Sequence, residues 1–301
     1  MANINLEEIL IVENKVGLEY FREEYGIEDL SVLVKELRKD PYLDVSDILK
    51  EYDSHYRTIE KLVDLLESQG LHYKIKKRKE LGFKDLDSAT LVLTIGGDGT
   101  FLDTAHFILD DKPILGINSY PEKSIGFYLS TNLYRLERDL LAMLNGDFYI
   151  EKRRRLKATI CDGNPTFGLA LNEVFIGKLY SMDMARYMII TDGIQEYQQS
   201  SGVVVALREG STGWLLNIPS SKMFDEEEQR MQFVNREPRN RGRDYKLNRG
   251  FTEKLEVVSM DYDLVVSLDS NRDRFIYHLS KGHRVIIETS NNPLRIIKFN
   301  K

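Results

Sequence analysis

The clearest chemistry in this sequence lies in five consecutive residues, Gly96, Gly97, Asp98, Gly99 and Thr100. They follow an apolar run and precede a predicted helix, an arrangement that presents backbone N–H groups to an anion such as phosphate. The glycines permit positive φ and close approach by a ligand. A carboxylate in such a cradle repels phosphate unless it serves a divalent cation or accepts a proton from a hydroxyl group. Both uses belong to phosphoryl transfer, so we predict that Asp98 orients and deprotonates an alcohol.

A purely structural role for Asp98 is the alternative. Aspartates often cap helices or stabilise turns by accepting hydrogen bonds from backbone N–H groups. A Gly-Gly-Asp-Gly-Thr run arises from average composition in only about one chain in several thousand. Chance is therefore a poor explanation for the run as a whole, and the role of its carboxylate is the open point.

The elements around the glycine turn have the pattern of an α/β domain. A strand is expected at 7–13, and a helix whose apolar stripe is closed by Gly70 follows it. Short apolar runs at 89–95 and 113–117 flank a predicted helix at 100–109. Strands that alternate with helices favour a parallel sheet. The helical stripe consists of Ile59, Leu62, Val63 and Leu66.

From about residue 148 the pattern changes to many short strands without long helices, which indicates a β-rich second domain. Strands are predicted at 156–161, 168–176, 186–191, 202–207, 255–259, 264–268 and 285–288. Residues 220–250 are highly charged and are predicted to form a solvated, mobile loop. The expected division is 1–147, 148–290 and a last segment, 291–301, that could return to the first domain.

Composition limits the class of protein. The 301 residues are 42% hydrophobic, enough for two cores, and the net charge of −6 argues against broad nucleic-acid or anionic-membrane binding. No apolar run approaches the roughly 18 residues that span a bilayer, and the N-terminus lacks a basic leader with a cleavage site, so a cytoplasmic location is expected. The single cysteine, Cys161, cannot form an intrachain disulfide, and the five histidines show no metal-ligand spacing.

The Gly-Gly-Asp-Gly-Thr run resembles the signature of the NAD kinases, and related patterns occur in diacylglycerol kinases, sphingosine kinases and phosphofructokinases. Leu171-Asn172-Glu173-Val174 looks like the Asn-Glu element by which NAD kinases hold the ribose hydroxyls of the dinucleotide. The stretch 200–214, SSGVVVALREGSTGW, is similar to the glycine-rich strand and turn that line the adenosine pocket in this family. Finer agreement at 116–126 and 236–238 resembles the mitochondrial-type branch of the family, and the resemblance covers about 10–300.

The resemblance implies a Rossmann-like N-terminal α/β domain, a C-terminal β-rich, β-sandwich-like domain, a nucleotide site between them and a homodimer. It implies Mg²⁺-dependent transfer of the γ-phosphoryl group of ATP to the 2'-hydroxyl of the adenosine ribose of NAD, giving NADP. Asp98 would then take the hydroxyl proton. The expected substrate- and nucleotide-binding residues are Gly96, Gly97, Gly99, Thr100, Asn118, Asn172, Glu173, Ser201, Gly210, Ser211 and Thr212, and metal ligands are left open.

Two departures from the family pattern keep alternatives open. Leu207-Arg208-Glu209 stands where the family usually has Thr-Pro-Thr or Thr-Gly-Thr, and an inward acid would repel phosphate unless Arg208 pairs with it. Asp269-Ser270 replaces an Asp-Gly turn, a change expected to be structural. The first departure supports a non-catalytic, NAD(P)-binding or regulatory homologue. A lipid or other small-alcohol kinase with the same glycine turn is the remaining alternative.

Overall fold

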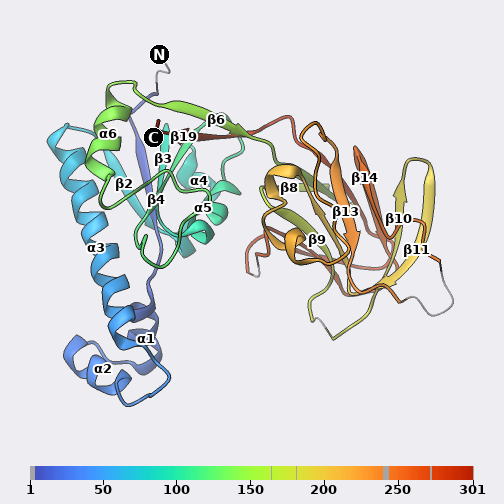
Figure 1. Cartoon of the computed structure of the whole chain (residues 1–301), viewed down its shortest axis with the longest axis horizontal. Helices are drawn as coiled ribbons and strands as arrows, with labels where there is room; N and C mark the ends of the chain where they lie inside the picture. Colours follow the sequence, from blue (N-terminus) through green and yellow to red (C-terminus); the bar gives the residue numbers. More distant parts are fainter. Residues whose placement is uncertain (1–3, 164, 181, 240–243, 272, 301) are drawn as a thin grey trace. The chain divides into compact units, whose positions relative to one another are not determined.

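The computed structural model describes residues 4–163, 165–180, 182–239, 244–271 and 273–300 (Figure 1). Its contacts divide the chain into two compact units, Met1–Lys152 with Leu294–Lys301, and Arg153–Pro293. The first unit is mixed α/β with a largely parallel sheet, and the second consists of antiparallel sheets. The predicted fold class, an α/β domain followed by a β-rich domain, is therefore confirmed.

Unit 1 is built on a seven-stranded sheet in the order β2-β1-β3-β4-β19-β6, with the short β5 paired to β4. Strands β2, β1, β3, β4 and β19 run parallel. The central strands β1, β3 and β4 are buried along their whole length, because helices cover both faces of a parallel sheet and leave no polar side. The strands are β1 Ile9–Glu13, β2 Tyr73–Lys77, β3 Leu91–Gly96, β4 Pro113–Asn118, β5 Thr131–Asn132, β6 Tyr149–Arg153 and β19 Leu294–Lys298.

Helices α3 and α6 lie on one side of this sheet, and α4 and α5 lie on the other (Figure 1). The predicted stripe of α3 places Leu62 and Leu66 in the core cluster, together with Leu136 and Leu140 of α6. Helix α3 ends at Ser68, just before Gly70, as the sequence indicates. The helical elements of unit 1 are α1 Gly17–Tyr25, α2 Leu30–Leu37, α3 Val45–Ser68, η1 Arg78–Glu80, α4 Phe83–Leu86, α5 Asp98–Ala105 and α6 Leu136–Leu144.

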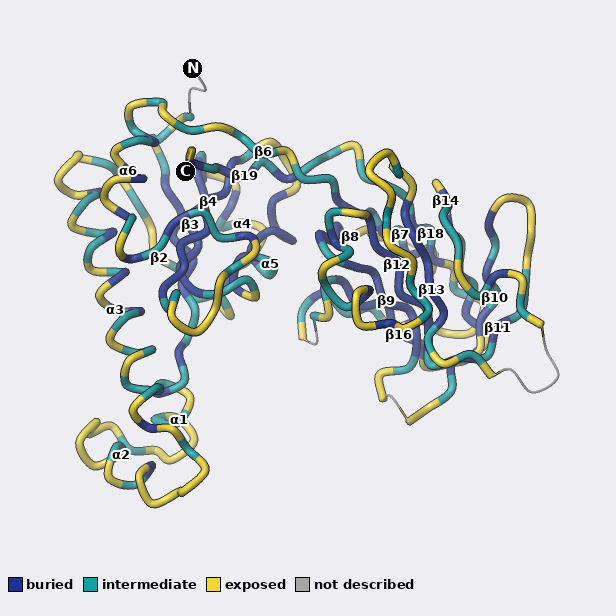
Figure 2. The backbone as a smooth tube through the Cα atoms, in the orientation of Figure 1, coloured by how far each residue is buried: buried dark blue, intermediate teal, exposed yellow. Residues whose placement is uncertain are grey.

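The helix predicted at 100–109 begins two residues earlier and ends four residues earlier. Gly97 is extended and serves as the N-cap of α5, so the helix includes Asp98. Beyond Ala105 the backbone continues in tighter turns, in which the N–H groups of Phe107 and Ile108 bond to carbonyls three residues back. A small lobe of α1, α2 and the start of α3 closes over its own core of Leu18, Leu33, Leu37 and Val45. The outer surface of α2 is exposed (Figure 2).

Unit 2 contains two six-stranded antiparallel sheets, ordered β11-β10-β15-β18-β7-β8 and β14-β13-β12-β9-β16-β17. The strands of the first sheet are β7 Leu156–Cys161, β8 Thr166–Ala170, β10 Ala185–Thr191, β11 Ile194–Ser200, β15 Lys254–Ser259 and β18 Arg284–Thr289. Those of the second are β9 Glu173–Lys178, β12 Val203–Ala206, β13 Met231–Asn235, β14 Arg249–Thr252, β16 Leu264–Leu268 and β17 Ile276–Leu279.

Burial differs between the two sheets. Strands β7, β10 and β15 alternate between buried and more exposed residues, as expected of a sheet with one wet face. Strands β12, β13 and β16 are buried throughout, because the short helix η3, Trp214–Asn217, and the segment after it cover their second face. Strand β9 of this covered sheet begins at the Asn-Glu element expected to bind ribose, and β12 pairs with it.

Two predicted elements of unit 2 were wrong. The strand expected at 168–176 is two strands, β8 and β9, which belong to different sheets and are separated by Leu171 and Asn172. The charged stretch 220–250 is not one solvated loop, since it contains β13, whose five residues are all buried between β12 and β14. Because charged residues flank this short strand on both sides, the average composition of 220–250 does not reveal it.

Candidate active site

The glycine turn joins the carboxyl end of β3 to the first turn of α5. Gly96 has a φ of 150°, which side-chain-bearing residues rarely adopt, and an added Cβ would lie 2.6 Å from the Oγ1 atom of Thr100. An added Cβ at Gly97 would meet nothing within 4 Å, so this backbone lies open to a ligand. The turn therefore has the geometry of an anion cradle at a helix N-terminus.

Thr100 is the buried member of this turn. The residue is 1% exposed, and its Oγ1 has no hydrogen-bond partner among the described residues. Buried hydroxyl groups are usually hydrogen-bonded, and one that is not costs about 1 to 3 kcal/mol. An unsatisfied hydroxyl directly beneath a glycine turn is an independent sign that the turn holds a polar ligand.

Asp98 is the first residue of α5, and its carboxylate does not cap that helix. Its Oδ2 accepts a hydrogen bond of 2.8 Å from the backbone N–H of Phe127, and its Oδ1 accepts one of 2.9 Å from that of Tyr128. Asp98 thus fixes the backbone at Phe127 and Tyr128 against the glycine turn. A carboxylate has about four acceptor positions, so these two bonds leave capacity for a substrate hydroxyl.

Asn118 ends β4 directly beside Gly96 in the parallel register, and its side chain is committed to the same segment. Its amide nitrogen donates to the carbonyl of Ser124 at 2.6 Å, and its amide oxygen accepts from the backbone N–H of Tyr120 at 3.0 Å. Asn118 is 4% exposed. In this structure it shapes the loop beside the turn and does not face outward.

Four polar side chains are linked in series near the carboxyl ends of the unit 1 strands: Ser119, His55, Glu13 and Lys77. His55 of α3 lies 3.0 Å from the hydroxyl of Ser119 through Nδ1 and 3.7 Å from the carboxylate of Glu13 through Nε2. Lys77 pairs with the other carboxylate oxygen of Glu13 at 3.0 Å. Burial opposes ionisation of Glu13, but the neighbouring His55 and Lys77 outweigh the effect of burial and lower the pKa of this carboxyl. No motif in the sequence marks Glu13, His55 or Lys77 as part of this site.

The Asn-Glu element of unit 2 starts β9 and is held by Asp269. The carboxylate of Asp269 accepts hydrogen bonds from the backbone N–H groups of Leu171, Asn172 and Glu173 at 3.0, 2.7 and 3.1 Å. The carboxylate thus satisfies three backbone N–H groups where the chain passes from β8 to β9. Asp269 and Ser270 have φ of 51° and 55°, so the turn that usually holds glycine keeps its left-handed backbone in this chain.

Glu173 is 2% exposed, and its carboxylate is bound on both sides. The hydroxyl of Ser270 donates to Oε1 at 2.8 Å, and the backbone N–H of Trp214 donates to Oε2 at 3.2 Å. Burial and the nearby charge of Asp269 raise the pKa of Glu173 to about 7, against the smaller opposing effect of the two donors. Ser270 therefore has a specific contact, which a glycine at this position would lack.

The turn after β12 lies against this element. A Cβ on Gly210 would stand 1.9 Å from the carbonyl oxygen of Asn172, so only glycine allows the two backbones to approach this closely. Ser211 is partly exposed and donates its hydroxyl to the carbonyl of Arg208, while Thr212 is exposed. Of the predicted binding residues of unit 2, the structure brings together Asn172, Glu173 and Gly210.

Ser201 lies elsewhere. It precedes the start of β12, where Val203 pairs with Ile176, whereas Glu173 pairs with Ala206 at the end of the strand. The hydroxyl of Ser201 donates to the carboxylate of Glu237. Four or five residues of extended strand thus separate Ser201 from the Asn-Glu element.

The sequence raised Arg208 as a possible partner of Glu209, and the structure gives this acid a different cation. The carboxylate of Glu209 instead forms a two-pronged ion pair with the guanidinium of Arg154, at 2.6 and 2.9 Å. Arg208 donates to the backbone carbonyl of Glu226. Leu207 is buried, at 1% exposure, and the side chains of Arg208 and Glu209 in the short helix η2, Arg208–Gly210, have different partners. The charge of Glu209 is therefore compensated by Arg154, which lies between β6 and β7, and not by the adjacent Arg208.

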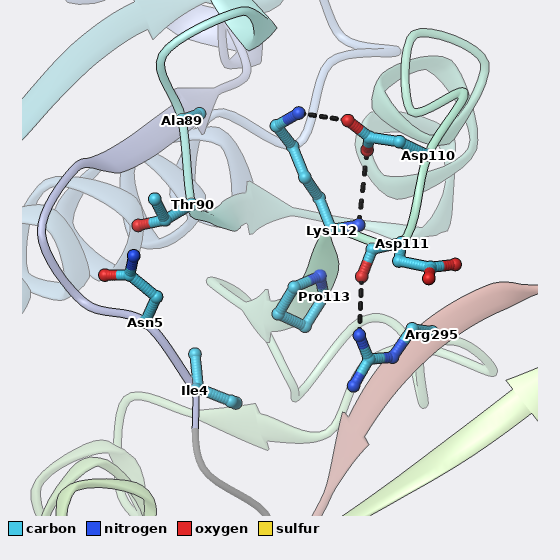
Figure 3. A pocket seen from close by; sticks show the side chains of 9 residues that line it. All are labelled: Ile4, Asn5, Ala89, Thr90, Asp110, Asp111, Lys112, Pro113 and Arg295. Carbon is cyan, nitrogen blue, oxygen red and sulfur yellow. Dashed lines mark hydrogen bonds and ion pairs between the residues drawn. The ribbon is translucent and has the colours of Figure 1, made fainter.

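A pocket of about 650 Å³ occupies the opposite edge of the unit 1 sheet (Figure 3). Thr90, Pro113 and Arg295 line it, and they lie at the amino ends of β3, β4 and β19. Its cations are engaged locally, since Arg295 donates to the carbonyl of Asp111 and Lys112 pairs with Asp110. None of the predicted site residues lines this pocket.

No group of three or more His, Cys, Asp and Glu side chains in the described ranges is arranged to hold a metal ion. Of the helices that the structure describes, none is long and apolar enough to cross a membrane.

Comparison with known proteins gives consistent matches. Residues 33–147 match the family model for the ATP-NAD kinase N-terminal domain. The chain is 27% identical over 253 residues to mitochondrial NAD kinase 2 of Rattus norvegicus, covering 70% of this chain and 60% of that protein. It is 31% identical over 191 residues to an NAD kinase of Marinomonas sp. (strain MWYL1), covering 62% and 63%. The chain thus spans about three fifths of these curated relatives.

The solved structure of an NAD kinase from Archaeoglobus fulgidus in complex with ATP matches with a TM-score of 0.64 at 17% identity, over 97% of this chain and 93% of that one. At this identity the likeness is one of fold. The family match thus covers residues 33–147, and the curated relatives named here are NAD kinases.

Proposed function

We propose that this protein is an NAD kinase that transfers the γ-phosphoryl group of ATP to the 2'-hydroxyl of the adenosine ribose of NAD. One observation carries the proposal: the glycine turn at the start of α5, with the buried, unpartnered Thr100 beneath it and Asp98 at its tip. This turn lies inside the segment that matches the ATP-NAD kinase N-terminal domain. The family relatives named NAD kinase support the choice of acceptor.

In unit 1, the N–H groups at Gly97 and the start of α5 bind phosphate oxygens, and Asp98 accepts the proton of the attacking hydroxyl. The two backbone bonds to Asp98 fix its carboxylate in one orientation, and positioning of this kind is a large part of phosphoryl-transfer catalysis. A positioned base of this type contributes about 10² to 10⁴ in rate.

In unit 2, Asn172 and Glu173 hold the ribose hydroxyls. Asp269 fixes the backbone of both residues, and Ser270 and Trp214 fix the carboxylate of Glu173. Because the side chain is nearly inaccessible to water, a hydroxyl bonded to it contributes more than it would at the surface. Recognition through hydroxyl groups discriminates strongly against ligands that lack them.

The donor set of the glycine turn fits a cation carried by the nucleotide better than one resident in the protein. Asp98 is a single carboxylate with two acceptor positions already used, and Mg²⁺ typically keeps several waters and binds through one or two carboxylates and substrate phosphates. When bound, Mg²⁺ offsets the charge of the phosphates. We therefore propose that it enters as Mg²⁺-ATP and that Asp98 faces it.

A homodimer and a cytoplasmic location complete the proposal, both following from the resemblance and the sequence. The dimer is tested by light scattering during size-exclusion chromatography, where a mass of about twice that of the chain is expected. The location stays a prediction, because one of the relatives is named as mitochondrial. A fractionation experiment on the native organism would decide it.

The decisive experiment is an assay of NADP formation with NAD, Mg²⁺ and either ATP or polyphosphate. NADP should form with ATP and not when Mg²⁺ or NAD is withheld. Phosphorylation of diacylglycerol without NADP formation would instead favour the lipid-kinase alternative. Binding of NAD without turnover would favour a non-catalytic homologue, although the ion pair of Glu209 with Arg154 removes the charge conflict that motivated that alternative.

A further inference from the structure

Arg78 stands next to the glycine turn, although it lies some twenty residues before it in the sequence. It directly follows β2, so it lies at the carboxyl edge of the parallel sheet, where Gly96 ends β3 and Asn118 ends β4. Its Nη1 atom is 3.6 Å from the position that a Cβ on Gly99 would take. Ligands of open α/β sheets bind outside this edge.

The guanidinium is fixed in place by α5. Its Nε donates to Oδ2 of Asp103 at 2.5 Å, and Asp103 lies one helical turn after Gly99. The side chain of Asp103 is 14% exposed and that of Arg78 is 32% exposed, so the pair is anchored inside while part of the arginine reaches solvent. Asp103 engages the inner nitrogen, Nε, while the terminal nitrogen Nη1 lies beside Gly99 of the turn.

The charges around the glycine turn favour a cation at the position of Arg78. Asp98 and Asp103 both lie on α5, and two carboxylates near a phosphate cradle repel a polyanion. Lys76 and Lys77, the preceding residues, are paired with Asp85 and with Glu13 and Glu19. Arg78 is the cation of this basic run that is placed over the turn, and arginine is suited to two-pronged phosphate binding.

We propose that Arg78 binds a phosphate group seated on the glycine turn and that Asp103 is the positioning residue that aims it. The inference rests on the proposed function for the identity of the ligand, which is the triphosphate of ATP or the diphosphate of NAD. Thr100, buried and unpartnered beneath the same turn, is independent support for a polar ligand at this place.

The test is direct calorimetric binding of ATP and of NAD, measured separately, to folded wild-type protein and variants. Arg78→Ala should weaken binding of the phosphate ligand about tenfold to a hundredfold, because a charge-assisted contact is lost. Loss for ATP alone identifies the donor, and loss for NAD alone identifies the acceptor. Arg78→Lys keeps the charge without the fork and should recover only part of the affinity.

Lys76→Ala is the matched control, since it removes the same charge two residues away from a side chain that pairs with Asp85. It should bind both ligands within about twofold of wild type, as expected for loss of one surface ion pair. Asp103→Asn should weaken the same ligand as Arg78→Ala, but less. Wild-type affinity for both ligands in folded Arg78→Ala and Arg78→Lys would overturn the inference. Because binding is measured without turnover, that result is distinct from a failure to form NADP.

Discussion

Two carboxylates, one in each unit, are proposed to act in the same reaction, and their surroundings in the structure differ. Asp98 is partly exposed at a helix start, and both of its bonds come from the backbone of one loop. Glu173 is 2% exposed, lies near a second acid, and has a pKa raised to about 7 by burial and by Asp269. A base needs access to its substrate, whereas a binding carboxylate gains strength from exclusion of water.

The largest effect should come from Asp98. Asp98→Asn removes the proton acceptor and should lower kcat by about 10² to 10⁴, with little change in NAD binding. The asparagine amide can accept only one of the two loop N–H bonds, so some loss of order in 119–130 is also expected. Steady-state kinetics and NAD calorimetry on the same preparation measure both effects.

Asn118→Ala separates the two roles of Asp98, because it loosens the same loop and leaves the carboxylate in place. It should cost much less in kcat than Asp98→Asn. Equal losses in the two variants, with unchanged pH dependence of kcat in Asp98→Asn, would mean that Asp98 acts only by holding the loop.

The second effect tests how tightly the Asn-Glu element is built. Gly210→Ala places a Cβ 1.9 Å from the carbonyl oxygen of Asn172, and the backbone must move to relieve the clash. We expect a loss of about 3 kcal/mol in the free energy of unfolding, measured in urea. Gly97→Ala is the control from the other unit, since it has a φ of −97° and nothing within 4 Å of the added Cβ. Similar losses in both variants would contradict this difference between the two turns.

Sequence patterns predicted the glycine turn, the central parallel strands and the Asn-Glu pair, because each is written in contiguous residues. The partners of these groups could not be predicted in this way. Phe127 and Tyr128 bind Asp98 through backbone N–H groups, which carry no side-chain signal. Asp269 acts from 96 to 98 positions away in the chain. Strand order brings such pairs together, and no local pattern encodes it.

Arg78 and strand β11 differ in how far the sequence marks them. Arg78 comes directly after the alternating run Leu71, Tyr73 and Ile75, and the carboxyl end of a predicted parallel strand is a place to look for ligand contacts. Strand β11, Ile194–Ser200, is rich in Gln and Glu because it is an edge strand with much of its surface exposed. Its polar composition resembles a loop more than a strand.

The third prediction concerns pH. The folded protein favours the protonated form of Glu173, whose pKa rises from 4.5 to about 7, so its contribution to stability is complete below pH 4.5 and is lost as the pH rises through 7. Wild type should therefore lose about 2 kcal/mol relative to Glu173→Gln between pH 5 and pH 7. Urea unfolding at several pH values measures the difference. Glu253→Gln, an exposed glutamate of the same unit, should show no such trend.

The smallest effect is expected at the departure from the family pattern. The ion pair of Arg154 with Glu209 is two-pronged, but both side chains are 25% exposed, so solvent screens it. Arg154→Ala should cost about 1 kcal/mol of stability, including the lost bond to the carbonyl of Gln229.

Arg154→Ala also leaves the charge of Glu209 uncompensated. If this acid faces the nucleotide, ATP affinity should fall in Arg154→Ala and recover in the double variant with Glu209→Gln, whereas Arg208→Ala should have little effect. Unchanged affinity in all three variants would place residues 207–209 outside the nucleotide site, and the departure from the family pattern would then have no bearing on catalysis.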